Sequence, residues 1–189
     1  MKKWLSFVLL FAAVLMTNVL VSCGDDNNDD PTVASVAGTY TGTDSLHFKM
    51  GATAYKTGVK NVQYVVKENS DKTINVTFPE ETYDFSATVP MVGKIVQGGY
   101  TVKNIPFDKA KKAYYLDYSK QGAKAHVSIP NMKIDKDYDV ISGQITVSFT
   151  GNTMSVINLH QFGVLDAIDN EVVVSKMPMT LNATYIGTK

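Results

Sequence analysis

The segment "ISGQITVSFTGNTMSV", Ile141 to Val156, decides the fold class. In its first half Ile145, Val147 and Phe149 are separated by single polar residues, which is the period of two expected of a strand with one buried face. Gly151-Asn152 then supplies a two-residue turn between two β-rich runs. The segment therefore predicts a β-hairpin.

The same alternation recurs along the chain, in "LHFKM" (46–50), "INVTF" (74–78) and "AKAHVSI" (123–129). Turn-forming residues lie between these runs. Only "FDKAKKAYY" (107–115) is compatible with a short helical turn. Many short strands joined by hairpins predict an all-β fold, either an antiparallel barrel or a sandwich.

One strand has apolar residues on both of its faces. In "NTMSVINLH" (152–160), Met154 and Val156 share one face, whereas Ile157 and Leu159 lie on the other. We expect either a β-bulge that shifts the phase or a second covered face.

The first 22 residues have the layout of a cleaved secretory signal peptide. Lys2 and Lys3 precede an apolar run that ends in small residues. A transmembrane helix is the alternative, since the run approaches the length of a span. Ser6, Thr17 and Asn18 interrupt the run, however, and no positive charge follows it, so cleavage is favoured.

The chain's single cysteine lies at the end of this segment. "LVSC" (20–23) resembles the lipobox of bacterial lipoproteins, which implies a lipid on Cys23 and attachment to a membrane through it. The run "DDNNDD" (25–30) predicts a flexible tether over residues 23–32. Its position resembles the acidic export tag of Bacteroidetes surface lipoproteins. That resemblance implies the outer membrane and its outer face, with a periplasm-facing anchor as the alternative.

Composition limits the possible partners. Removal of residues 1–22 leaves 167 residues (189 − 22), enough for one domain with a core. The formal net charge is zero and all 18 basic residues are lysine. A chain without a basic excess has no electrostatic footprint for nucleic acid, and the lack of arginine argues against phosphate recognition.

A family resemblance covers residues 33–189. The stretches "VAGTYTGT" (36–43), "VKNIPF" (102–107) and "ISGQITVSFTGNTMSV" resemble the calycin-like β-barrel lipoproteins of Bacteroidetes. The resemblance implies an antiparallel up-and-down barrel of about eight strands and a family whose biochemical role is largely unassigned. Gly38-Thr39-Tyr40 replaces the Gly-x-Trp of true lipocalins, and no disulfide can form.

No motif for catalysis or for a cofactor is present in the sequence. There is no Gly-x-Ser-x-Gly, no His-Glu-x-x-His and no phosphate loop. The three histidines, His47, His126 and His160, are far apart. We therefore predict a non-enzymatic module without a cofactor that binds a small molecule, a glycan or an envelope partner. A hydrolytic enzyme acting on envelope or dietary material and a purely structural envelope module are the alternatives.

Three site hypotheses remain. Asp135, Asp137 and Asp139 would project together from an extended segment and could hold Ca²⁺, although a solvated turn is the simpler interpretation. Tyr115 would be the surface aromatic of "KKAYYLDY" and a ligand contact. Ser45 in "DSL" resembles the O-glycosylation acceptor of Bacteroidetes.

Overall fold

The computed structural model of the chain describes residues 35–117, 123–166, 168–169, 172–177 and 179–189. Thirteen β-strands cover most of these residues, and the one helical segment among them is a 3₁₀ turn at Pro130–Met132. The strands are β1 (Gly38–Met50), β2 (Thr53–Glu68), β3 (Ile74–Phe78), β4 (Glu81–Asp84), β5 (Lys94–Gln97), β6 (Tyr100–Ile105), β7 (Phe107–Asp108), β8 (Ala113–Asp117), β9 (Lys124–Ile129), β10 (Ile134–Thr150), β11 (Thr153–Leu165), β12 (Val173–Lys176) and β13 (Leu181–Thr188).

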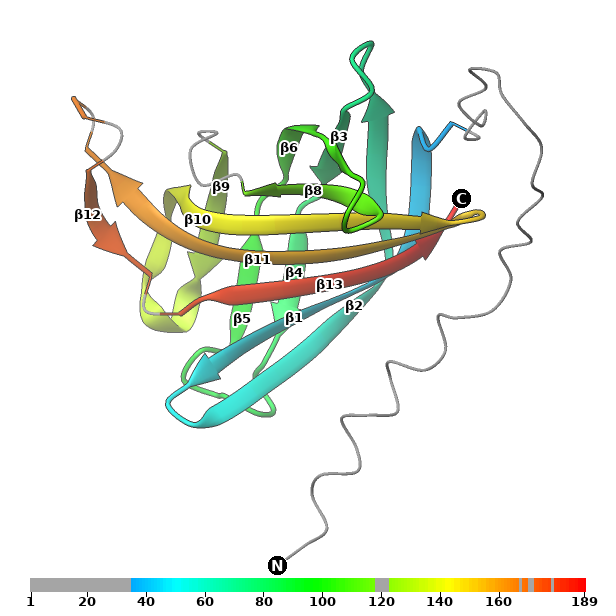
Figure 1. The fold of residues 1–189 in the computed structure, drawn as a ribbon. Helices are drawn as coiled ribbons and strands as arrows, with labels where there is room; N and C mark the ends of the chain where they lie inside the picture. Colours follow the sequence, from blue (N-terminus) through cyan, green and yellow to red (C-terminus); the bar gives the residue numbers. More distant parts are fainter. Residues whose placement is uncertain (1–34, 118–122, 167, 170–171, 178) are drawn as a thin grey trace, which may run out of the picture. The chain divides into compact units, whose positions relative to one another are not determined.

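All strands belong to one antiparallel sheet with the order β4-β5-β9-β10-β11-β13-β1-β2-β3-β6. Three short strands lie off this path, since β12 pairs with β11, β7 with β8, and β8 with β10. The sheet is strongly curled, and the long strands β10, β11 and β13 curve side by side across it (Figure 1). The last strand, β13, lies between β11 and β1, so the two ends of the described domain meet within the sheet.

A broken hairpin over residues 74–105 connects the two ends of this order. Two residues separate β3 from β4, and two separate β5 from β6. The register continues across the break, because Phe78 pairs with Tyr100 before it and Glu81 pairs with Gln97 after it. On its outer sides the hairpin pairs with β2 through β3 and with β9 through β5. The chain therefore bridges the sheet's ends at this hairpin.

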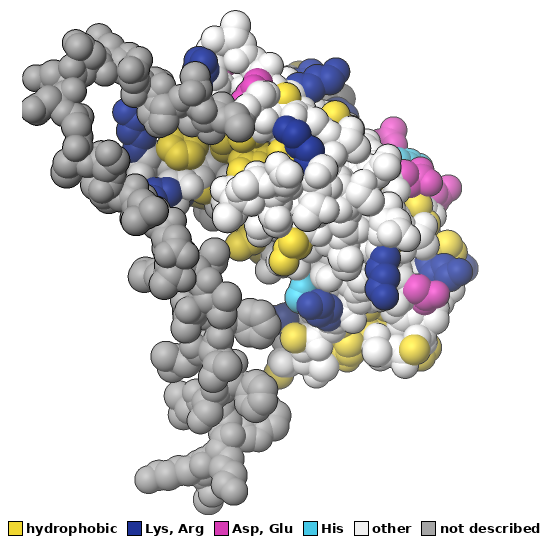
Figure 2. Space-filling model, turned by 90° about the vertical axis from the view of Figure 1, so that its right-hand side faces the viewer, with side chains coloured by type: hydrophobic (Ala, Val, Ile, Leu, Met, Phe, Trp, Pro, Cys, Tyr) yellow, Lys and Arg dark blue, Asp and Glu magenta, His cyan; other side chains and the backbone are white. Residues whose placement is uncertain are grey.

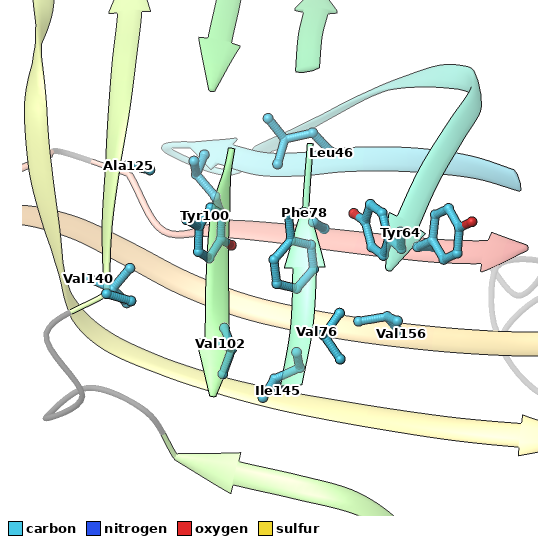
Figure 3. Packing of buried hydrophobic residues seen from close by; sticks show 14 of the residues in the cluster. Leu46, Tyr64, Val76, Phe78, Tyr100, Val102, Ala125, Val140, Ile145 and Val156 are labelled. Atoms are coloured by element: carbon cyan, nitrogen blue, oxygen red, sulfur yellow. The ribbon is translucent and has the colours of Figure 1, made fainter. Parts of the chain in front are cut away.

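The concave face of the sheet encloses the core. Side chains from many strands converge there, including Leu46, Val76, Phe78 and Ile145 (Figure 3). Leu46, Val76 and Ile145 are completely buried. Burial of one such side chain stabilises a fold by about 1.5–3 kcal/mol, so the alternation seen in the sequence supplies the main driving force.

The structure confirms an all-β antiparallel fold and corrects two details. The described chain has more strands than the eight expected, because several long strands are interrupted. Residues 107–115 hold no helical turn; they form β7, a tight turn and β8. Gly151-Asn152 makes the expected turn between β10 and β11. The signal peptide, Cys23 and the acidic tether lie outside the described residues.

The outward residues of β11 correct a further expectation. The register of β11 shows no shift between Thr153 and Leu159, so no bulge changes its phase there. Met154 and Val156 are buried, while Ile157 and Leu159 are 53% and 42% exposed. Both expected explanations are therefore wrong for the described chain. Among the described residues, no helix is long and apolar enough to cross a membrane.

The joint between the first and last strands depends on two glycines and one tyrosine. Gly42 pairs with Gly187 across β1 and β13. The Tyr185 ring stacks on Tyr64 with 3.9 Å between ring centroids, and its hydroxyl donates to the Tyr40 carbonyl oxygen at 2.6 Å. A Cβ atom on Gly187 would overlap the Tyr185 ring, so glycine is needed where the ring lies.

We predict that Gly42→Ala destabilises the domain by about 1–3 kcal/mol, the usual cost of forced overpacking. The added methyl group would overlap the Ile186 carbonyl oxygen and the Gly187 backbone, neither of which can move without opening the β1–β13 ladder. Urea unfolding of the soluble domain measures the change. Thr41→Ala, at an exposed position of the same strand, is the control, and equal stabilities of the two variants would contradict the prediction.

Candidate functional site

Four polar side chains form a cluster inside the curled sheet. Asp44 comes from β1, Tyr64 from β2, and Glu81 and Tyr83 from β4. All four are buried, with Asp44 at 0% and Glu81 at 5% exposure. The Tyr64 hydroxyl donates to Oδ2 of Asp44, and the Tyr83 hydroxyl contacts the same oxygen at 3.0 Å and Oε2 of Glu81.

This cluster retains a proton. The Tyr83 hydroxyl has one hydrogen but contacts two carboxyl groups, so the second contact requires a proton on a carboxyl. Burial, followed by the nearby charge of Asp44, raises the pKa of Glu81 to about 8. Burial also raises the pKa of Asp44, although its hydrogen bonds oppose that change. At neutral pH Glu81 is therefore the protonated partner, and Asp44 accepts hydrogen bonds.

A second interior group lies beyond the broken hairpin. Gln97, the cross-strand partner of Glu81, has its Oε1 atom 3.3 Å from Nε2 of His160. The Asn158 amide donates to the Tyr100 hydroxyl at 2.7 Å. Burial lowers the pKa of His160 to about 4, so its ring is neutral at physiological pH. Asn158 and His160 are almost completely buried, each at 1% exposure.

The opposite, convex face of the sheet has a region without formal charge that covers parts of four adjacent strands. Exposed charged residues limit it at Lys49 of β1 and at Asp137 of β10. Its outward residues alternate with buried ones along β10, β11, β13 and β1. We call these fifteen residues the uncharged outer face: Ser142, Gln144, Thr146, Ser148, Ser155, Ile157, Leu159, Gln161, Asn182, Thr184, Ile186, Thr41, Thr43, Ser45 and His47. Burial and the nearby Lys56 lower the pKa of His47, which keeps this histidine neutral.

Charged residues border this face. Lys56 and Lys60 of β2 pair with His47 and Thr43 on one side, and Asp117 of β8 pairs with Gln144 on the other. On the face of the domain that Figure 2 shows, lysines and acidic side chains are scattered over a largely uncharged surface, and a few of them lie together at its right edge. Charged residues make up 19% of the chain, whereas the fifteen residues of this region include none.

The sheet register brings two predicted site residues into one row. Tyr115 pairs with Thr146, which pairs with Ile157. Ile157 pairs with Thr184, which in turn pairs with Ser45. Tyr115 and Ser45 are 70 positions apart in sequence (115 − 45), yet they are at opposite ends of a single row across the outer surface.

The structure shows where Tyr115 and Ser45 lie but does not test their proposed roles. Tyr115 faces outward as expected, and the Lys111 ammonium lies 4.5 Å from the centre of its ring. Ser45 is half-buried in β1, and its neighbours Asp44 and Leu46 point into the core. The folded chain thus presents only Ser45 of the "DSL" tripeptide. Ligand binding by Tyr115 and glycosylation of Ser45 stay predictions.

A hollow of about 160 Å³ opens on the outer face near Tyr115. It is lined by Asp117, Ser142, Gly143, Gln144, Leu159, His160 and Thr180. A register shift leaves Ile141 unpaired immediately before Ser142, and bulges of this kind redirect the neighbouring side chains. The hollow therefore combines a carboxylate, an amide and hydroxyl groups with one exposed leucine.

The three aspartates of the calcium hypothesis are divided between two other partners. Asp135 and Asp137 contact the two ring nitrogens of His126 at 3.0 and 2.9 Å, and these contacts raise the pKa of that histidine. Asp139 forms an ion pair with Lys124 at 2.8 Å. Among the described residues, no group of three or more His, Cys, Asp and Glu side chains is arranged for a metal ion. Calcium binding at this trio stays a prediction.

Sequence analysis missed the buried polar residues, although the sequence contained a signal for them. Asp44 is in phase with Leu46 and Phe48, which alternation places in the core. Asn158 and His160 are likewise in phase with Met154 and Val156 on β11. A polar residue at an inward position of a strand with clear apolar alternation is thus the pattern that identifies such a cluster.

Comparison with protein-family models found no match, and comparison with curated proteins found none either. Comparison with solved structures found a candidate outer membrane protein from Bacteroides fragilis NCTC 9343. It is 18% identical to this chain with a TM-score of 0.48, and the match covers 82% of this chain and 51% of that protein. The chain thus spans about half the length of that protein.

We predict that the domain loses stability as the pH rises from about 6.5 to 8. Below that range the lowered pKa of His160 gives an opposite change, since the unfolded chain protonates this histidine first. The folded chain holds a proton on Glu81 up to about pH 8, whereas the usual pKa is 4.5. The resulting stabilisation is complete below pH 4.5 and is lost as the pH rises through about 8, at up to about 1.4 kcal/mol per pH unit. Glu81→Gln, which stays neutral, should flatten this dependence in urea unfolding between about pH 6.5 and 9.

The control for this measurement is Glu80→Gln. Glu80 precedes Glu81 in the chain and is exposed, so its substitution should leave the pH dependence as it is in the parent. Parallel pH profiles for the parent and the Glu81→Gln variant would show that Glu81 does not hold the proton.

Proposed function

We propose that the protein is a lipid-anchored outer-membrane lipoprotein with a calycin-like domain, and that it binds an uncharged ligand through its outer face. Cys23 would carry the lipid, and the acidic segment after it would hold the domain away from the membrane. The cell surface is the proposed location. The observation that carries the binding function is the uncharged outer face, with Ile157, Leu159 and Ile186 exposed upon it.

Physical chemistry supports a binding role for this surface. Soluble domains keep charged side chains on exposed sheet faces, because charge there maintains solubility and prevents association. Ile157 is 53% exposed and Ile186 is 64% exposed on adjacent strands, with hydroxyl and amide side chains between them. Such a face loses little hydration free energy when it is covered, since no ion must be desolvated.

The part of the interior that the structure describes offers no comparable surface. Aromatic rings fill it, with Tyr64 stacked on Tyr185, and Phe78 stacked on Tyr100 at 4.7 Å between ring centroids. The polar groups there hydrogen-bond to one another inside the core. Binding at the outer face therefore requires no rearrangement of the core, whereas binding inside would.

The proposed anchor predicts a simple change in localisation. Cys23→Ser removes the sulfur that would carry the lipid, so the protein should move from the membrane fraction to the soluble fraction of the envelope. Cell fractionation with immunodetection measures this change. Ser22→Ala keeps the cysteine and a small residue before it, so this control should remain membrane-bound. Retention of the Cys23→Ser protein in membranes would exclude the lipid anchor.

The proposed binding surface predicts that a single charge at its centre abolishes binding. Native mass spectrometry of residues 31–189, incubated with an extract of the host's envelope and growth medium, should show a discrete added mass. Ile157→Lys should remove the added mass, because binding would desolvate the new ammonium group. Met91→Lys replaces another exposed apolar residue away from this face and should retain it.

Two results would count against the proposal. An unchanged added mass in the Ile157→Lys variant would place binding elsewhere on the domain. A parent domain that shows only the mass of the unliganded protein would contradict the proposed ligand binding. A protein partner would then be sought by crosslinking in intact cells.

A further inference from the structure

The hollow beside Tyr115 has the dimensions of a site for one small ring. Its volume is about 160 Å³, and a cavity of about 150 Å³ is known to admit benzene. It lies on the outward side, because Ser142, Gln144 and Leu159 alternate with buried residues of β10 and β11. The rest of the uncharged outer face extends from it across β13 and β1.

The groups that line the hollow are suited to a neutral, hydroxyl-rich ring. The Gln144 amide both donates and accepts hydrogen bonds, and the hydroxyls of Ser142 and Thr180 can do either. Asp117 adds a negative charge at the edge of the hollow and already interacts within the chain. Leu159 adds an apolar contact, which is 42% exposed. Small-molecule sites usually combine an apolar contact with a small number of polar groups around it.

The charge of the hollow disfavours an anionic ligand. A phosphate or an acidic sugar in it would meet the Asp117 carboxylate, and none of the described lining residues is cationic. Lys111 is cationic, but it lies over the Tyr115 ring beside the hollow and is not part of the lining. Lys56 and Lys60 are on β2, separated from β10 by β11, β13 and β1. An aliphatic chain would leave the amide and hydroxyl groups without partners, which is costly.

Tyr115 extends the same site toward the row that ends at Ser45. It is two residues from Asp117 on the same face of β8, and its ring is half-buried. The Lys111 ammonium covers the ring at 4.5 Å, but an exposed contact of this kind contributes only about 0.5–1 kcal/mol. A second ring could replace the lysine there and stack on the tyrosine.

We propose that the hollow is a saccharide site, in which Gln144, Ser142 and Thr180 bind the hydroxyl groups of one neutral sugar unit and Tyr115 stacks on the next. The inference rests on the proposed function, since it names the ligand class of the outer face. The ligand is an uncharged polysaccharide, with successive units lying across the row from Tyr115 toward Ser45.

The test is retention of the full mature chain, in detergent, on beads that carry mannan, dextran, galactan or xyloglucan. Polygalacturonate beads serve as the charged comparison. Retention is expected on at least one neutral polysaccharide and not on polygalacturonate, with elution by the free polymer. Gln144→Ala should reduce retention at least tenfold and Tyr115→Ala several-fold. Gln63→Ala, an exposed amide of β2 outside the hollow, should leave it unchanged.

The outcomes separate this inference from the proposed function. No retention on any neutral polysaccharide, or retention that Gln144→Ala leaves intact, overturns the saccharide site. In that case, the parent domain is compared with the Ile157→Lys variant in native mass spectrometry. An added mass that the parent shows and the variant lacks would mean that the outer face binds a ligand of another class. If both signals are missing, the outer face is not a binding surface. Equal thermal unfolding of all variants ensures that lost retention reports the site rather than folding.

Discussion

The architecture depends on the contact that joins the first strand to the last. Tyr185 crosses the glycine pair Gly42–Gly187, stacks on Tyr64, and donates to the Tyr40 carbonyl oxygen. Only residues without a Cβ atom permit this close approach, because a methyl group on either glycine would overlap its neighbours. Once β13 is held between β11 and β1, these strands present one continuous convex surface, and the broken hairpin can connect the remaining edges.

The same curvature explains the buried carboxyl groups. Asp44 of β1 lies close to Glu81 of β4 inside the curled sheet, because β4 continues β3 across the break and β3 is joined to β1 through β2. Two ionised carboxylates at that distance in a dry core would repel strongly, so one of them keeps its proton and Tyr83 bridges the pair. The cost of burying these groups is reduced by hydrogen bonds that form only when the sheet is curled. A polar cluster of this kind specifies the curled arrangement over a flat one.

Alternation in the sequence predicted the strand content well, because the pleat forces every second side chain into the core. The residues of "INVTF" coincide with β3, and those of "GQITVSF" lie in β10 with the predicted face buried. Alternation could not predict where a long strand breaks, since Pro79 and the Gly98-Gly99 pair act through cross-strand pairing that one sequence does not specify. It also could not bring Tyr115 and Ser45 into one row, because that row requires the register of four ladders.

The division between a packed interior and an uncharged exterior argues for recognition at the convex surface. A barrel-like domain that binds inside must leave space there, and this core is filled by stacked rings whose removal would expose buried carboxyl groups. Ile157 and Leu159 are exposed on the convex face, at positions where charged side chains normally keep a sheet face soluble. Their exposure contributes nothing to the core, so folding stability does not account for them. Contact with the proposed neutral ligand would account for them, because covering these side chains together with hydroxyl and amide groups would remove apolar surface from water without desolvating an ion.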